Sequence, residues 1–335
     1  MRFDIIIEPN RTPEETARLG RLAEACGLGG VWVANNSNGR DAFVNFAPLA
    51  MQTSKIHLGP IAVSPQELHP LKMAVSLLSF NELSGGRGQI VVGAGGGTAA
   101  AMHKTLERPV AGVRECIQIL ERAARGEAFS HQGEHFPIRW IDTRWVSQEP
   151  PMIYAGANGP QMLRSAARHA RGIMVSDFTP DRVEWARELI NPVLAERGVD
   201  AAGYPLNNFW AWHVKESAEA ARREARIWLY VRATAHENYV RDVLDEDEAQ
   251  LVIDHRDAFR DAWYRKSPDI EGVPDSILDK LVDGAVSASP LADIDREVER
   301  MRAFAAAGLN QIALRLYDDA EASIRIIGDK LVGAI

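Results

Sequence analysis

Short apolar runs alternate with longer amphipathic segments along most of the chain. Apolar runs bounded by glycine or proline are typical of buried strands, whereas apolar residues at helical spacing predict helices. Thr12 and Pro13, for example, provide an N-cap and a first helical residue. The pattern predicts strands at 3–8, 30–34, 56–63, 88–93, 152–155, 172–176, 208–214 and 311–316, and helices at 13–26, 41–52, 70–83, 109–125, 160–170, 180–197, 294–307 and near the C-terminus up to 331.

Alternation of strands and helices indicates a parallel sheet of the α/β class. Right-handed crossovers leave two architectures, an open doubly wound sheet and a closed barrel. Eight strands with eight helices favour the (β/α)₈ TIM barrel, and we expect one domain over residues 1–335. Two segments interrupt the alternation. Residues 126–150 predict a hairpin insertion, and residues 218–284 predict a charged, helical excursion between the seventh and eighth strands.

Composition narrows the class of protein. The chain has 335 residues, of which 46% are hydrophobic and 25% charged, as in ordinary globular proteins. Its two cysteines, Cys26 and Cys116, both lie in helical segments, which argues against a disulfide scaffold and suits a reducing compartment. No apolar run has the length of a signal peptide or a membrane span, so we expect a cytoplasmic protein. The net charge of −8, without a basic block, argues against a nucleic-acid partner.

In a barrel of this kind the functional site lies at the carboxyl ends of the strands. That rule selects Glu8, Asn35, Asn36 and His213 as candidates for proton transfer. Glu8 is equally interpretable as a strand-end carboxylate in a salt bridge, and His213 as a packed, hydrogen-bonded histidine. The histidines show no metal-ligand spacing, so we expect no metal site.

Two glycine-rich turns follow predicted strands. The run 93–97 lets a ligand approach the backbone closely, but Thr98 stands where a dinucleotide fingerprint needs glycine, so a flexible turn is the other interpretation. The run 154–160 joins a strand directly to a helix N-terminus, whose free N–H groups and dipole favour a phosphate. A plain turn with proline at the first helical position is the alternative there.

Several stretches resemble the luciferase-like superfamily: His69-Pro70-Leu71-Lys72-Met73-Ala74, Leu83-Ser84-Gly85-Gly86-Arg87 and Val92-Gly93-Ala94-Gly95-Gly96. Others are similar to its methylenetetrahydromethanopterin reductase branch: Arg108-Pro109, Arg114-Glu115-Cys116-Ile117, Gly133-Glu134-His135-Phe136, Ile153 to Leu163 and Gly308-Leu309-Asn310-Gln311-Ile312. The resemblance covers residues 1–215 and 285–335, and little of 218–284.

The resemblance implies a barrel that binds reduced FMN or the deazaflavin coenzyme F-420. It also implies a non-prolyl cis peptide within 61–64, which shapes the ring pocket, and a phosphate seat at 156–160, whose Gly-Pro form favours the deazaflavin. The cofactor-binding residues are then Ala62, Val63, Ser64, Gly93, Ala94, Gly95, Gly96, Gly156, Ala157, Asn158, Gly159 and Pro160.

The chain departs from the pattern of that branch at three places. It has Ile6 and Gly96 where the reductases carry acids, and Asn35-Asn36 where deazaflavin relatives often carry Asp-His. These differences put the pterin substrate and the family's acid–base roles in doubt. Glu8 lies on the same barrel face as Ile6 and is a possible substitute for the lost acid.

Three hypotheses of function follow. The first is an oxidoreductase that transfers hydride between coenzyme F-420 and a small organic substrate. The second is an FMN-dependent monooxygenase that receives reduced flavin from a separate reductase. The third is a degenerate barrel that binds a cofactor without turnover. In each case we expect a homodimer or a higher homo-oligomer.

Overall fold

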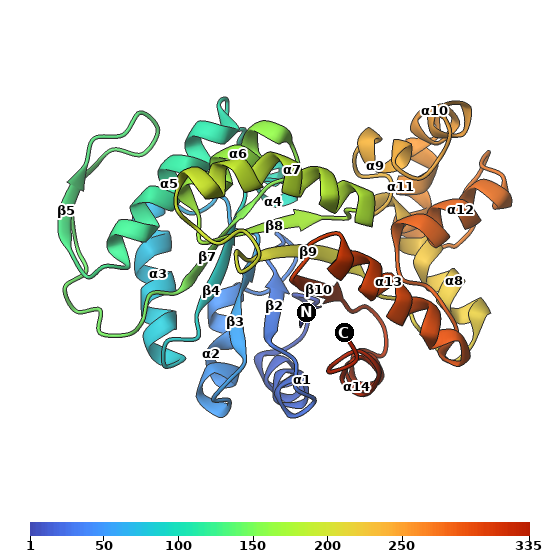
Figure 1. Ribbon diagram of the computed structural model, residues 1–335, viewed down its shortest axis with the longest axis horizontal. Helices are drawn as coiled ribbons and strands as arrows, with labels where there is room; N and C mark the ends of the chain where they lie inside the picture. The colour runs from blue at the N-terminus through green and yellow to red at the C-terminus, as the bar shows by residue number, and fades with distance from the viewer.

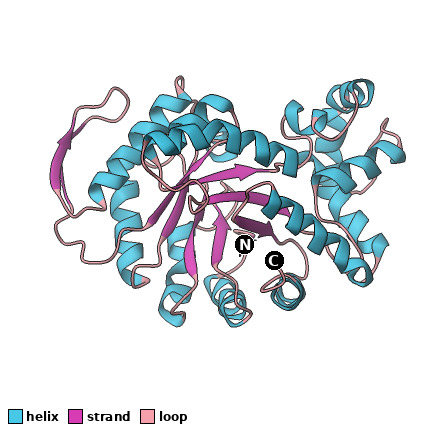
Figure 2. Ribbon diagram, viewed as in Figure 1, coloured by secondary structure: helices cyan, strands magenta, loops and turns pink.

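Eight parallel strands form a ring at the centre of the molecule (Figures 1 and 2). The computed structural model describes the backbone of residues 1–335 and the side-chain surroundings of all of them except Gly97. Neighbours in the ring follow the order β3-β2-β1-β10-β9-β8-β7-β4. The predicted TIM-barrel fold is confirmed. Its strands are β1 (Arg2–Ile7), β2 (Gly30–Ala34), β3 (His57–Ile61), β4 (Gln89–Val92), β7 (Met152–Gly156), β8 (Gly172–Ser176), β9 (Leu206–Ala211) and β10 (Gln311–Arg315).

The ring closes between β3 and β4. Leu58 N donates to the carbonyl of Arg87 at 3.0 Å, and Val63 N donates to that of Val91 at 2.9 Å. Between these two bonds Gly59 faces β4 so closely that a Cβ there would lie 1.7 Å from the carbonyl oxygen of Gln89. Closure of the barrel at this seam therefore requires glycine at position 59.

Helices pack around the outside of the ring (Figure 1). Their predicted start signals are confirmed: Thr12 and Glu15 form a capping box, and Asp41 Oδ1 accepts a hydrogen bond from Val44 N at 2.9 Å. The short helix α4 was not predicted, because its five residues are too few to show a period. The outer helices are α1 (Pro13–Ala25), α2 (Ala42–Gln52), α3 (Pro70–Leu83), α4 (Gly97–Ala101), α5 (Pro109–Ala123), α6 (Pro160–His169), α7 (Pro180–Glu196), α13 (Ile294–Ala306) and α14 (Ala320–Lys330).

The inside of the barrel is packed rather than open. Ile6, Trp32 and Tyr154 belong to an apolar cluster there, and all three are fully buried. Below this cluster Asp4 accepts hydrogen bonds from Arg2 Nε at 2.7 Å and from Trp32 Nε1 at 3.0 Å. This network lies at the amino ends of the strands, where side chains of such barrels contribute to stability. Of the two ends of the barrel, the carboxyl end is therefore the one left open to a ligand.

The predicted hairpin insertion is confirmed. It consists of β5 (Ala128–His131) and β6 (Ile138–Asp142), which pair antiparallel and project from one end of the molecule (Figure 1). Glu115 of α5 anchors its turn, since the carboxylate accepts hydrogen bonds from Phe136 N at 2.7 Å and His135 N at 2.9 Å.

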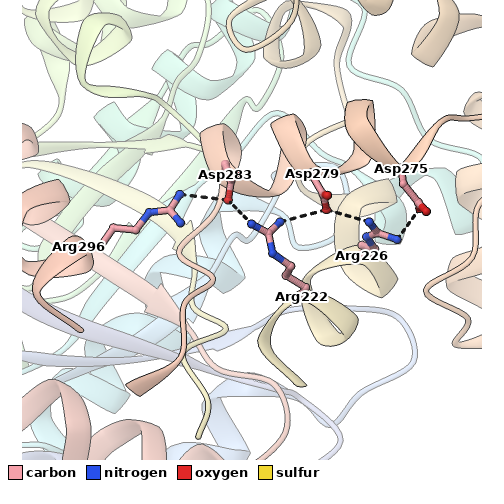
Figure 3. Close-up of polar contacts among 6 residues, drawn as sticks. All are labelled: Arg222, Arg226, Asp275, Asp279, Asp283 and Arg296. Carbon is pink, nitrogen blue, oxygen red and sulfur yellow. Dashed lines mark hydrogen bonds and ion pairs between the residues drawn. The ribbon is translucent and has the colours of Figure 1, made fainter. Parts of the chain in front are cut away.

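The predicted helical excursion is confirmed at the opposite end of the molecule (Figure 1). It has its own buried apolar cluster, and an ion-pair ladder ties two of its helices, α8 and α12, to α13 (Figure 3). Arg226 bridges Asp275 and Asp279 at 2.8 Å each, and Arg222 links Asp279 to Asp283. The excursion contains α8 (Ala218–Trp228), α9 (Glu237–Arg241), α10 (Glu246–Asp254), α11 (Arg256–Arg265) and α12 (Asp275–Ala285), with 3₁₀ turns at Leu229–Val231 and, beyond α12, at Leu291–Asp293.

The seventh strand of the ring, β9, ends earlier than predicted. The apolar run continues through Trp212, but the chain leaves β10 there and pairs with the segment after α12. His213 N donates to the carbonyl of Ser287 at 2.7 Å. The predicted position of His213 at the strand end is therefore wrong. The apolar residues after Ala211 pair with the segment that follows α12, and they do not continue β9. None of the described helices has both the length and the apolar content that crossing a membrane requires.

Candidate functional site

A cleft opens at the carboxyl ends of β2, β3 and β4, with a volume of about 210 Å³. We call it the β2–β4 cleft. The three loops that line it were all predicted from the sequence, and only Glu67 and Thr98 are additions. The lining residues are Asn35, Asn36, Ala62, Val63, Ser64, Glu67, Gly93, Ala94, Gly95, Gly96 and Thr98.

The peptide bond between Ile61 and Ala62 is cis, where the resemblance predicted one. Small residues stand opposite it. A Cβ at Gly93 would lie 3.2 Å from the Cβ of Ala62, and one at Gly95, whose φ is +112°, would lie 3.2 Å from Ser64 Oγ. Any side chain at these two glycines would press on the opposite wall, so the glycines keep the cleft open.

Glu67 is the one ionisable side chain among the described residues that line this cleft. Its Oε1 accepts hydrogen bonds from Ser64 N at 2.5 Å and from Asn35 Nδ2 at 3.1 Å. Burial raises the pKa of Glu67 above its ordinary value, although these two hydrogen bonds oppose the shift. A carboxyl group in this state can both give and take a proton.

A second cleft of about 270 Å³ lies at the N-terminus of α6, and we call it the α6 cleft. Gly159 is the N-cap of α6 and provides no side-chain cap, so amide hydrogens of the first helical turn have no side-chain partner. A Cβ at Gly159 would meet nothing within 4 Å. The cleft is lined by Asn158, Gly159, Arg182, His236, Glu237, Asn238 and Tyr239.

Arg182 of α7 is the arginine that lines the α6 cleft, together with the carboxylate of Glu237. The Nε of Arg182 is buried and has no hydrogen-bond partner among the described residues. The guanidinium lies 4.1 Å from the ring of Trp185, and the carboxylate of Asp242 is 3.8 Å away. A helix N-terminus, an open N-cap and a partly unsatisfied guanidinium together form a seat for an anionic group such as a phosphate.

The other residues of the predicted phosphate turn shape the backbone. Asn158 Nδ2 donates to Tyr239 Oη at 2.6 Å, and its Oδ1 accepts from Ser176 N at 3.0 Å. Ala157 is buried, Gly156 ends β7 and Pro160 is the first residue of α6. Of the five predicted residues, Asn158 and Gly159 line the cleft, and the remaining three position them.

Glu8 forms an ion pair at the mouth of the barrel, since Arg315 Nη2 lies 2.5 Å from its Oε1. The guanidiniums of Arg315 and Arg232 lie 5.6 Å and 4.1 Å from the ring of Phe209. Arg232 is also 3.4 Å from Asp177, whose pKa is raised by burial. The salt-bridge interpretation of Glu8 is the one that this geometry favours.

His213 lines neither cleft. It is fully buried, its Nδ1 lies 2.8 Å from Glu224 Oε2, and its ring stacks on Tyr317 with the centroids 4.7 Å apart. Burial lowers the pKa of His213 and outweighs the hydrogen bond to Glu224. The packed-histidine interpretation accounts for all of these contacts. Among the described residues, no three or more His, Cys, Asp or Glu side chains gather closely enough to hold a metal ion.

Several site residues were not predicted, among them Glu67, Arg182, Arg232 and Tyr239. Glu67 lies three positions after Ser64, in a loop that the sequence had already placed at the site. Arg182 lies in the first turn of the helix after β8, and the barrel topology places that turn beside the phosphate seat. Arg232 and Tyr239 come from the helical excursion, where the sequence gives no signal of what they contact.

The chain matches the family described as luciferase-like monooxygenase over residues 1–311, and it belongs to that family. Its relatives include proteins named 5,10-methylenetetrahydromethanopterin reductase. The one from Archaeoglobus fulgidus is 29% identical over 99% of both chains.

Solved structures support the fold. The coenzyme F-420 dependent tetrahydromethanopterin reductase of Methanopyrus kandleri superposes with a TM-score of 0.82 at 20% identity, covering 99% of this chain and 98% of that one. An F-420-dependent secondary alcohol dehydrogenase gives 0.75 at 16% identity over all of both chains. The FMN-bound oxygenating constituent of 3,6-diketocamphane monooxygenase from Pseudomonas putida gives 0.69 at 18% identity, covering 100% and 98%.

Proposed function

We propose that this luciferase-like oxidoreductase transfers hydride between a deazaflavin coenzyme of the F-420 type and a small organic substrate. One observation carries the proposal: two clefts at the carboxyl face of the barrel supply, separately, a glycine-walled slot beside a cis peptide and an anion seat. The relatives and solved structures named for methylenetetrahydromethanopterin or F-420 support it.

The residues of both clefts fit such a coenzyme. Ala62 to Ser64 and Gly93 to Gly96 would hold its ring system, because their small side chains leave a narrow slot. The first turn of α6 and Arg182 would hold its phosphate, because the N-cap space is open and Arg182 Nε lacks a partner. The β2–β4 cleft would therefore select the ring system by its shape. The α6 cleft would bind the phosphate through electrostatic attraction.

When bound, a reduced deazaflavin supplies a hydride, and the protein supplies position and a proton. Glu67 would carry that proton at its carboxyl group in the β2–β4 cleft, because burial raises its pKa and so favours the neutral form. Asn35 and Ser64 N hold the same carboxyl in place through Oε1. Reduction of a carbonyl then takes the proton from Glu67, and oxidation of an alcohol returns it.

Cofactor titration of the purified protein tests the proposal. We expect coenzyme F-420 to bind with a dissociation constant at least about tenfold below that of FMN, a difference of about 1.4 kcal/mol. The fluorescence of each cofactor reports its binding. Tighter binding of FMN would contradict the deazaflavin assignment.

The FMN-dependent monooxygenase is the second candidate, and the FMN-bound structural neighbour supports it. It predicts consumption of oxygen by the protein with photoreduced FMN. The degenerate barrel is the third, and it is motivated by Ile6, fully buried inside the barrel, and Gly96, both at positions where acids were expected. It predicts tight cofactor binding with no turnover of any acceptor. The cytoplasmic location, the homo-oligomeric state and the lack of nucleic-acid partners remain predictions.

A further inference from the structure

The groove between α5 and α6 concentrates positive charge on a protein whose net charge is −8. Two adjoining cavities, of about 280 and 560 Å³, open along it and share Arg168 and His169. Figure 1 shows the two helices side by side. The charged residues of this α5–α6 groove are seven arginines, one glutamate and one histidine: Arg114, Glu121, Arg122, Arg125, Arg164, Arg168, His169, Arg171 and Arg197.

Most of this charge is not neutralised by the protein. Glu121 is engaged by Arg171, whose Nε lies 2.9 Å from its carboxylate. Among the described residues no carboxylate lies within ion-pair distance of Arg114, Arg125, Arg164 or Arg168. Guanidiniums without partners repel one another, and an anion between them removes that repulsion.

The arginines converge, although they come from separate segments. His169 lies close enough to Arg114 of α5, Arg168 of α6 and Arg197 beyond α7 that all three lower its pKa, in addition to the larger effect of burial. Arg164 and Arg168 are one helical turn apart, about 6 Å along α6. The groove therefore offers successive cationic sites along a line rather than one point.

We propose that the α5–α6 groove binds an elongated ligand with several phosphate or carboxylate groups. The groove begins at Gln161, the second residue of α6, and so lies on the outer side of the helix whose N-terminus forms the anion seat. The proposal does not depend on the redox function. It depends only on the unpaired guanidiniums that line this one groove.

Binding of inorganic tripolyphosphate and of tetra-L-glutamate tests the proposal by calorimetry at low ionic strength. We expect at least one of them to bind with a dissociation constant below about 1 mM. The Arg164→Glu/Arg168→Glu double variant should weaken that binding at least about tenfold. The probe with the lower dissociation constant shows whether the groove prefers phosphate or carboxylate groups. If neither binds, the groove is a solvated face and the proposal is wrong.

Arg223→Glu/Arg265→Glu is the matched control, because both arginines are exposed and unpaired among the described residues and the net charge changes equally. It should change the affinity less than about twofold, and an equal loss in both double variants would overturn the proposal. Gly159→Asp should leave groove binding intact, which separates the groove from the α6 cleft.

The ring protons of His169 give a readout at the site itself, assigned with His169→Gln. A bound anion offsets the three guanidiniums and should raise the pKa of His169. An unchanged His169 titration in the presence of a bound probe would place binding elsewhere. A short oligonucleotide that binds more tightly than either probe through the same arginines would also overturn the assignment, in favour of a nucleic-acid surface.

Discussion

Asn35 Nδ2 donates a hydrogen bond to Glu67 Oε1 at 3.1 Å, and this bond joins the ends of β2 and β3 across the β2–β4 cleft. It fixes the carboxyl group next to the cis peptide. Ser64 N shares the same acceptor atom, and no described protein donor bonds Oε2. One carboxyl oxygen is therefore held while the other is available to a ligand.

Glu67→Gln should abolish proton exchange while keeping the shape of the cleft. We expect kcat to fall about 100-fold, within the usual range for loss of a general acid. Carbonyl reduction by the wild type should slow as pH rises through the raised pKa of Glu67, because the neutral acid is then lost. The variant should lack that inflection.

Cofactor affinity is the accompanying measurement for Glu67→Gln, and it should change less than about threefold. Glu82→Gln on the exposed part of α3 is the matched control. An unchanged pH profile in Glu67→Gln would remove Glu67 from the reaction, while the cofactor assignment would stand on its own titration.

Gly159→Asp should weaken cofactor binding at least about tenfold, because it places a carboxylate where a phosphate is expected. Gly159→Ala is the control, since its Cβ meets nothing within 4 Å and leaves the charge unchanged. Fluorescence titration of both variants gives the comparison. Equal affinities for the two variants would exclude the α6 cleft as the phosphate seat.

Gly59→Ala should destabilise the barrel by about 3 kcal/mol or more, because its methyl group would overlap the carbonyl of Gln89 at the β3–β4 seam. Gly198→Ala is the control for replacing a glycine. Its Cβ meets nothing within 4 Å, so its only cost is the strain of alanine at a left-handed φ. Urea unfolding measures the difference. Similar stabilities for both variants would show that the backbone between β3 and β4 moves apart to accommodate the methyl group.

The His213–Glu224 pair should make stability depend on pH. Burial lowers the folded-state pKa of His213, and hydrogen bonds from His213 and Lys215 lower that of Glu224 despite its burial. For each group the unfolded chain binds a proton at a higher pH than the folded chain does, so stability falls as the pH drops. The histidine contribution is lost below about pH 6.5 and that of the glutamate at lower pH.

Thermal unfolding of the wild type and of His213→Gln between pH 8 and pH 5 checks this expectation. The variant should lose less stability over that interval than the wild type, although its stability at pH 8 should be lower. Parallel curves would show that another group controls the acid sensitivity.

The sequence predicts the ring well because each of its strands is a short apolar run with a strong helix start after it. Pro70 and Pro160 open α3 and α6 at the predicted residues. The β2–β4 cleft was predictable for a related reason. Once the barrel order is known, the loops after three successive strands meet at one end.

The sequence does not predict contacts made across long separations. Tyr239 reaches Asn158 from 81 positions away, and Arg232 reaches Asp177 from 55. Neither pair has a local pattern, because the helical excursion folds around its own apolar cluster. His213 shows the same limit: its role depends on Glu224 and Tyr317, which only tertiary packing brings together.

The helical excursion leaves the ring after β9 and returns to it at β10, and these two strands are neighbours. A segment inserted between adjacent strands can change in length and composition without shifting the register of any strand pair. The ladder of Arg222, Arg226 and their aspartates holds the excursion as a unit (Figure 3). Exchange of this segment between relatives would therefore remodel the α6 cleft, which it helps to line, while the β2–β4 cleft stays unchanged.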